Sequence, residues 1–260
     1  MKETINHFGG KFWSEGGKMA ELTVQQDRYR ESTRCGILPA TITLSIREPG
    51  SALTHFAALI MMAMGAGPLL SRALRYGSVY TTAGMMIFIV STCLLYSAST
   101  VYHTIVAGLR VTTFFRKLDH CSISVMIAGT YTPVCLTVLR GRTGYALLAS
   151  IWGLAVIGVV MKLFWITCPK WMSSVLYIAM GWLCVFAMKP LLEVLSSAEF
   201  LWLLAGGIFY TVGAGIYAMH PKKFDAKHIY FGSHEIFHVF IMMGTFCHYM
   251  VMYSYLVFSK

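Results

Sequence analysis

Charged residues are scarce in this sequence. Only 12% of its 260 residues are Asp, Glu, Lys or Arg, whereas 57% are hydrophobic. A water-soluble domain carries about 25% charged residues. The chain therefore has too few charges to cover a water-facing surface, and its composition predicts an integral membrane protein. The formal net charge of +10 is not gathered in a Lys/Arg-rich run, so it does not indicate nucleic-acid binding.

Other signals are also missing. Seven cysteines are an odd number without a C-x-x-C pair, which predicts neither a disulfide framework nor a cysteine metal site. The first residues, MKETINHFGGKFWSEGG, contain no apolar stretch, so we expect no cleaved signal peptide. There is no repeat of fixed period. The apolar runs are continuous and do not alternate with polar residues, which argues against membrane-spanning strands.

Long apolar runs are what the sequence does have. A helix needs roughly 20 residues to cross about 30 Å of hydrocarbon. The runs predict an all-α polytopic membrane protein with seven transmembrane helices in residues 51–260, preceded by a polar cytoplasmic tail, residues 1–50. The seven runs are Ala52–Leu70, Ala83–Val106, Cys121–Leu139, Tyr145–Val160, Val175–Met188, Phe200–Met219 and Ile236–Phe258.

Basic residues predict the orientation, because Lys and Arg are enriched in cytoplasmic loops. With the N-terminus inside, ten basic residues fall inside and six outside, which favours this orientation with the C-terminus outside. The inside set is Arg34, Arg47, Arg110, Arg116, Lys117, Lys162, Lys170, Lys222, Lys223 and Lys227; the outside set is Arg72, Arg75, Arg140, Arg142, Lys189 and Lys260.

Polar residues gather at the ends of three predicted spans, where their burial is costly and indicates function. The second span ends with Ser99 and His103 one helical turn apart, and the third begins with Asp119. The seventh begins with HEIFH, which places His234 and His238 on one helix face and matches the H-E-x-x-H pattern of zinc proteases. In an alternating bundle these three span ends lie on the same side of the membrane.

Three neutral imidazoles suit zinc and leave a fourth position for water. We therefore predict that His103, His234 and His238 bind Zn²⁺ near the cytoplasmic side, with Asp119 hydrogen-bonding either that water or a ligand histidine. Ser99 is predicted to orient His103 or to donate to a substrate oxygen.

Four other polar residues lie near these span ends or within the seventh span. His55 falls in the same layer, as a candidate outer contact, and we expect His120 to be packed or interfacial. His248 lies ten residues beyond His238, about 15 Å along a helix, and is too far to share the ion. Glu235 is either a general base or a solvated residue at the helix mouth.

These residues also resemble a known family. EPGSALTHF, SASTVYHT, KLDHCSISVMIAGTYTPVCL and GSHEIFHVFIMMGTFCHYM are similar to motifs of the hemolysin III family, the bacterial branch of the progestin and adipoQ receptor (PAQR) proteins. The resemblance implies a zinc ion held by His103, His234 and His238, an aspartate near its water at Asp119, and the family's serine at Ser99. It covers the chain from about residue 47 onward.

Two readings of function follow. The first is a zinc-dependent hydrolase of lipid amide or ester bonds, similar to the ceramide hydrolases that the receptor branch resembles, with Asp119 and Ser99 as catalytic residues and a membrane lipid as substrate. The second is a non-enzymatic membrane sensor, or a cytolytic hemolysin, in which the zinc is structural. A transporter is disfavoured because the centres of the spans lack carboxylates.

Overall fold

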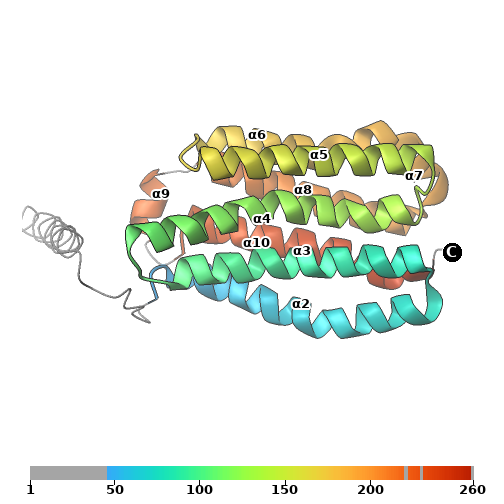
Figure 1. The fold of residues 1–260 in the computed structure, drawn as a ribbon, viewed down its shortest axis with the longest axis horizontal. Helices are drawn as coiled ribbons and strands as arrows, with labels where there is room; N and C mark the ends of the chain where they lie inside the picture. The colour runs from blue at the N-terminus through green and yellow to red at the C-terminus, as the bar shows by residue number, and fades with distance from the viewer. Residues whose placement is uncertain (1–45, 220–221, 229–230, 259–260) are drawn as a thin grey trace, which may run out of the picture. The chain divides into compact units, whose positions relative to one another are not determined.

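Helices make up the described structure. The computed structural model describes residues 46–219, 222–228 and 231–258, and within these ranges it contains helices and no strand (Figure 1). The predicted all-α class is thus confirmed, while the tail up to residue 45 lies outside the described residues. The elements are α2 (Pro49–Tyr76), α3 (Val79–Thr104), α4 (Leu109–Leu136), α5 (Arg142–Phe164), α6 (Lys170–Gly181), η1 (Trp182–Ala187), α7 (Met188–Val194), α8 (Ser197–Met219), α9 (Lys222–Lys227), α10 (Ser233–Ser254) and η2 (Leu256–Phe258).

Six helical segments among the described residues are long and apolar enough to cross a membrane. They are Pro49–Tyr76, Val79–Thr104, Arg142–Phe164, Lys170–Val194, Ser197–Met219 and Ser233–Phe258. Helices suit this setting because they satisfy their own backbone hydrogen bonds.

The predicted third span coincides with α4, which has 28 residues but is not among these six. Ser122, Ser124, Thr130 and Thr132 lower its hydropathy, and all four are buried inside the bundle. This helix begins at Leu109, twelve residues before the predicted start at Cys121. The predicted start was too late because the first turns of the helix are polar and do not belong to the apolar run. Hydropathy alone therefore supports six of the seven predicted spans.

Local sequence signals explain where the helices begin. Pro49 occupies the first turn of α2, where its missing N–H is not needed. Ser78 caps α3: its hydroxyl accepts from the Thr81 N–H at 3.2 Å, and the Ser78 N–H donates to Thr81 Oγ1 at 3.1 Å. At α10 the Glu235 carboxylate accepts from the Gly232 N–H at 2.8 Å.

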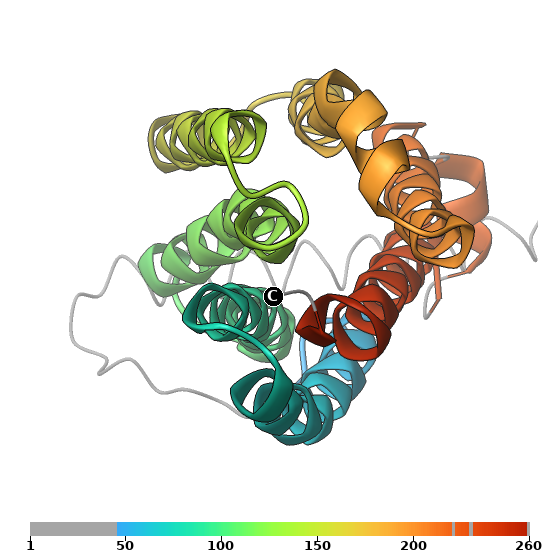
Figure 2. The ribbon, with the colours of Figure 1, turned by 90° about the vertical axis from the view of Figure 1, so that its right-hand side faces the viewer.

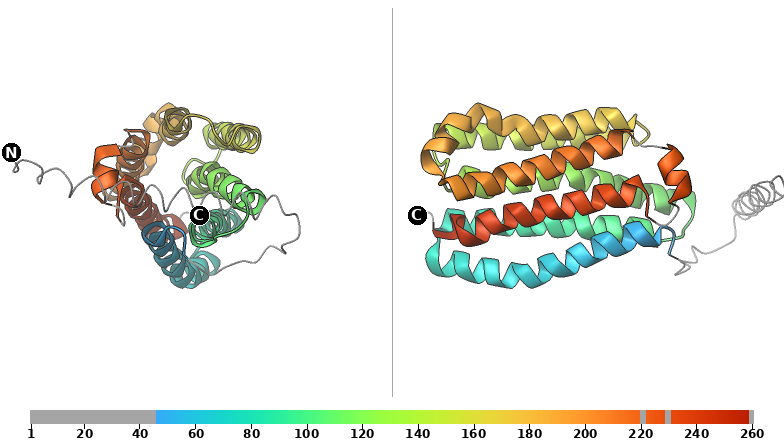
Figure 3. Two further views of the ribbon diagram at one scale, coloured as in Figure 1. Left: turned by 90° about the vertical axis from the view of Figure 1, so that its left-hand side faces the viewer. Right: turned by 180° about the vertical axis from the view of Figure 1, so that it is seen from behind.

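The helices are arranged around a common interior, as the end-on views show (Figure 2 and the left panel of Figure 3). Along one side α3 packs between α2 and α4, and α5 packs outside α4. Along the other side α10 packs between α2 and α8, and α8 packs against α6. The carboxyl end of α3 and the amino ends of α2, α4 and α10 meet at one end of the bundle (Figure 1). That end holds the polar residues singled out in the sequence.

Candidate metal centre

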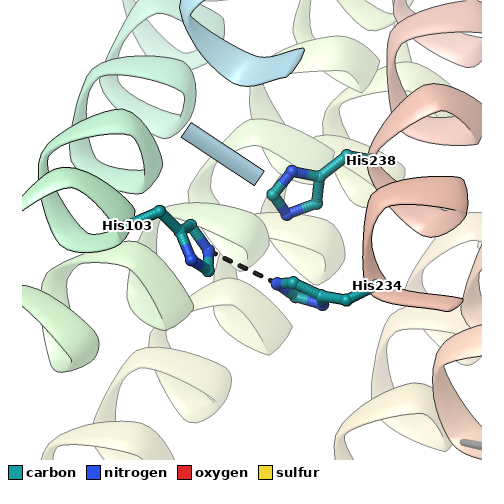
Figure 4. Close-up of side chains that lie close together, drawn as sticks. All are labelled: His103, His234 and His238. Carbon is teal, nitrogen blue, oxygen red and sulfur yellow. Dashed lines mark hydrogen bonds between the residues drawn. The ribbon is translucent and has the colours of Figure 1, made fainter. Parts of the chain in front are cut away.

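Three histidines from two distant helices converge at this end of the bundle. His103 comes from the last turn of α3, and His234 and His238 from the first turns of α10. One nitrogen from each ring lies within 4.8 Å of the other two, and His103 Nε2 is 3.3 Å from His234 Nε2 (Figure 4). His103 and His238 are each only 2% exposed. The arrangement can hold a metal ion.

Glu48 fixes the orientation of the His103 ring. Its Oε2 lies 2.5 Å from His103 Nδ1. Burial alone would raise the pKa of Glu48, but the hydrogen bond with His103 and the neighbouring charge of Arg47 hold that pKa below its usual range. The carboxylate therefore only accepts, so Nδ1 carries the hydrogen. The lone pair of a neutral His103 is then on Nε2, which faces His234.

The segment that carries Glu48 is tied to the end of α3. The Glu48 N–H donates to the His103 carbonyl at 3.0 Å, and the Arg47 N–H donates to the Thr104 carbonyl at 3.3 Å. The Arg47 guanidinium lies 4.2 Å from the centre of the Tyr102 ring, and its Nε is 3.2 Å from Glu48 Oε1. These contacts keep the carboxylate beside His103.

Thr54 fixes the orientation of the His238 ring. Its Oγ1 lies 3.0 Å from His238 Nδ1 and donates its hydrogen to the backbone, with the Ser51 carbonyl at 2.9 Å. Since that hydrogen is already used, Thr54 accepts from the Nδ1–H of His238, and the lone pair of a neutral ring is again on Nε2. Metal-binding histidines usually donate their second N–H to such an acceptor.

The donor set fits a divalent cation. When neutral, His103 presents a lone pair at Nε2 only 3.3 Å from His234 Nε2, where a lone pair on each atom would repel the other. A cation or a shared proton between the nitrogens removes that repulsion. Histidine nitrogens are common zinc ligands, and three of them leave an open position.

His55 lies directly against the centre. Its ring stacks on His238 with 3.6 Å between centroids and an 8° angle between planes. It is 3% exposed, and neither of its ring nitrogens has a hydrogen-bond partner. The sequence predicted an outer contact here, and the structure places the ring in the site without a partner of its own.

Glu235, the glutamate of the H-E-x-x-H match, is occupied elsewhere. Its Oε2 accepts from the Gly232 N–H, and its Oε1 accepts a short hydrogen bond from the Ser51 hydroxyl of α2. The carboxylate therefore caps α10 and ties it to α2. The two roles predicted for Glu235, a general base or a solvated residue at the helix mouth, stay predictions.

Asp119 lies beside the three histidines but is not part of their close group. It is 7% exposed, and its Oδ2 is 3.1 Å from Nδ1 of the adjacent His120. Ser99, one turn before His103, is 1% exposed, and its hydroxyl has no partner. Asp119 faces the interior cavity, whereas Ser99 is not among the residues that line it.

An elongated cavity leads away from the centre. His55, Asp119, His234 and His238 line one end. The α4 face that continues it runs from Asp119 to Val134, about 22 Å of helix. The walls beyond the centre are mostly apolar, and the far end is lined by Leu139, Leu147, Met188, Leu191, Phe200 and Leu203. The cavity therefore has a polar end at the histidines and a long apolar remainder.

Comparison with known proteins identifies relatives that cover most of this chain. The sequence profile described as "Haemolysin-III related" matches residues 44–249. The chain belongs to the haemolysin-III-related family. It is similar to "Hemolysin-3" of Bacillus cereus, with 38% identity over 76% of this chain and 86% of that protein. It is also similar to "Hemolysin-3 homolog" of Bacillus subtilis, with 36% identity over 76% of this chain and 89% of that protein.

More distant relatives carry receptor names. An "ADIPOR-like receptor" of Saccharomyces cerevisiae is 27% identical over 60% of this haemolysin-III-related chain and 53% of that protein. A "Progestin and adipoQ receptor-like protein 1" of Caenorhabditis elegans is 26% identical over 62% of this chain and 41% of that protein. The predicted resemblance to the hemolysin III branch of the PAQR proteins is thereby confirmed.

Sequence reasoning missed two residues of the haemolysin-III-related site, Glu48 and Thr54. Glu48 lies in the predicted polar tail and Thr54 lies in the first predicted span, and neither was predicted to contact a ligand histidine. A signal was present, because Ser51, Thr54 and His55 recur at helical spacing on one face of an apolar run. Polar side chains in that pattern face other protein groups and not lipid.

Proposed function

We propose that this protein is a zinc-dependent hydrolase of lipid amide or ester bonds, comparable to a ceramidase, in the plasma membrane. The observation that carries the proposal is that two of the three clustered histidines, His234 and His238, line the polar end of a long, mostly apolar cavity. A lipid with its carbonyl at that end could place its chain in the remainder of the cavity. A metal bound only to stabilise the fold would not need an adjoining cavity.

The metal that suits the centre is zinc, held by His103, His234 and His238. Zinc would polarise the substrate carbonyl and activate water at neutral pH. The second N–H of His103 and of His238 already has an acceptor, Glu48 or Thr54. These acceptors support the assignment of both rings as ligands through Nε2.

Two further side chains are assigned to the reaction. Asp119 lines the cavity and takes a proton from the attacking water at its carboxylate, then returns it to the leaving nitrogen or oxygen. His55 lines the same end with both nitrogens buried and unpartnered, and it is assigned as a hydrogen-bond donor to the carbonyl oxygen. Ser99 lies outside the cavity lining and its hydroxyl has no partner, so no step is assigned to it.

The topology proposed is seven crossings, with α4 as the third, the N-terminus inside and the centre near the cytoplasmic side. Two observations support it. Ser122, Ser124, Thr130 and Thr132 of α4 are buried within the bundle, so these hydroxyl groups do not contact lipid. The distribution of Lys and Arg favours the cytoplasm at the histidine end.

A second candidate is a receptor-like or cytolytic membrane protein in which zinc is structural. It is favoured by the names of the relatives, hemolysins and receptor-like proteins. The two candidates differ in what Asp119 does, because a structural site has no use for a carboxylate that lies outside the close group of histidines.

The deciding experiment is Asp119→Asn in purified protein, tested with a fluorescent long-chain ceramide and its ester analogue. We expect zinc content and thermal stability to be retained while turnover falls by about 10²- to 10⁴-fold, as for loss of a general acid–base group. Glu193→Gln, at an exposed carboxylate elsewhere in the chain, is the matched control and should keep full turnover. Undiminished turnover in Asp119→Asn would contradict the catalytic assignment.

A further inference from the structure

A second polar residue lies deep in the cavity. His248 is on α10, ten residues beyond His238, and therefore about 15 Å further along the helix axis. It lines the cavity, is 9% exposed, and its Nδ1 has no hydrogen-bond partner. Buried polar groups almost always have a partner, so an imidazole left over in a cavity wall points to a partner that comes from outside the protein.

The neighbouring hydroxyl groups are hydrogen-bonded to one another and not to His248. Tyr96 Oη and Tyr210 Oη both lie beside Thr245 Oγ1, at 2.8 and 3.0 Å. The Thr245 hydroxyl donates its own hydrogen to the Ile241 carbonyl at 2.9 Å, so both tyrosine hydroxyls donate to Thr245. This group is satisfied without His248, although the Tyr210 ring lies only 5.3 Å from the His248 ring.

The facing helix leaves room for this imidazole. Gly206 of α8 lies opposite the ring, and a Cβ added there would be 2.6 Å from His248 Nε2. Any other residue at position 206 would displace the ring. The fold thus holds a histidine, with one donor and one acceptor in its neutral form, in an otherwise mostly apolar wall.

We propose that His248 is a second recognition point for the lipid, and that it hydrogen-bonds a hydroxyl group partway along the chain. The ligand would be a long-chain lipid hydroxylated in mid-chain, with the reacting carbonyl at the histidine centre and the hydroxyl roughly 15 Å deeper. The cavity continues past His248 into apolar residues such as Leu191 and Leu203, which suit the rest of the chain. This inference deepens the proposed function and rests on it for the position of the carbonyl.

The test compares the binding of free fatty acids, which requires no turnover. Octadecanoic acid and two hydroxylated forms, one with the hydroxyl near mid-chain and one with it beside the carboxylate, compete with a fluorescent fatty acid for purified protein. We expect the mid-chain hydroxy acid to bind roughly fivefold to tenfold more tightly than the plain acid, the size of one net hydrogen bond. The form with its hydroxyl beside the carboxylate should show no such preference through His248.

Three variants locate the effect. His248→Phe keeps a ring but removes the hydrogen-bonding atoms, and should abolish the preference while the plain acid still binds. His248→Gln, which retains a donor and an acceptor, should keep part of it. Tyr210→Phe removes a neighbouring hydroxyl that is already bonded to Thr245 and should leave the preference unchanged.

The outcomes separate this inference from the proposed function. An unaltered preference in His248→Phe, no preference in the wild type, or binding of neither acid would overturn the recognition point. A preference that depends on His248, in protein that hydrolyses no lipid amide or ester, would uphold it and reject the hydrolase. Lipid turnover without any preference for the mid-chain hydroxyl would uphold the hydrolase and overturn the recognition point.

Discussion

The residues around the three histidines decide which ring nitrogens are left for a metal. Glu48 and Thr54 each accept the Nδ1 hydrogen of one ligand, so the free lone pairs lie on Nε2. Both acceptors come from the short stretch at the start of α2. The metal affinity should therefore depend on residues that are not themselves ligands.

Replacing Glu48 tests this dependence. In Glu48→Ala the His103 Nδ1–H loses its acceptor, and we expect zinc affinity to fall by about 10- to 100-fold, the usual effect of losing such a partner. Glu48→Gln, which keeps a carbonyl acceptor, should lose less. Competition with a chelator of known affinity measures both variants, and Glu193→Gln serves as the control. Equal zinc affinity in Glu48→Ala, Glu48→Gln and Glu193→Gln would mean that Glu48 does not support metal binding.

Glu235 gives the opposite expectation. Because its carboxylate caps α10 and bonds Ser51, Glu235→Ala should destabilise the protein by about 0.5–2 kcal/mol, as for loss of a helix cap. In Glu235→Gln the amide oxygen can still accept from the Gly232 N–H and the amide nitrogen can donate to the Ser51 hydroxyl, so this variant should keep lipid turnover within a few-fold of the wild type. A loss of 10³-fold in that variant would restore the zinc-protease reading of H-E-x-x-H, with Glu235 as general base.

At the scale of the helices, close packing sets where the histidine-bearing elements lie. Gly84 of α3 faces Pro133 of α4, and a Cβ at Gly84 would lie 2.9 Å from Pro133 Cα. Backbone atoms cannot move aside as a flexible side chain can. The approach of α3 to α4 therefore depends on this glycine.

Gly84→Ala should consequently lower the stability of the bundle, by roughly 1–3 kcal/mol for an overpacked contact. Gly67→Ala is the matched control, because nothing lies within 4 Å of a Cβ at that position of α2. Alanine there should be neutral or stabilise α2 by up to about 1 kcal/mol. Thermal unfolding in detergent measures both, and equal melting temperatures would contradict the packing argument.

The helices were largely predictable from the sequence, but the contacts among them were not. Continuous apolar runs indicated the helices, and polar residues at three span ends indicated His103, His234 and His238. Glu48 and Thr54 escaped because their role depends on how the start of α2 packs against α3 and α10. The α4 helix was predicted to begin late because its first turns are polar, and hydropathy does not follow a helix into such residues.

At the scale of the whole molecule, seven crossings would put the two ends of the bundle domain on opposite sides of the membrane. Alkaline phosphatase is active only outside the cytoplasm, and we expect it to be active when fused after Lys260. Green fluorescent protein at the same position should stay dark. The reverse pattern would mean an even number of crossings, with α4 outside the bilayer, or an inverted orientation.

The account depends most on the metal itself. X-ray absorption at the zinc edge, on protein purified without chelator, measures both the ion and its ligands. We predict about one zinc per chain, three imidazole nitrogens and one further oxygen from water, with the ion lost in His103→Ala. Protein that carries less than about half an equivalent of zinc, or a zinc bound by four protein groups, would contradict the hydrolytic centre.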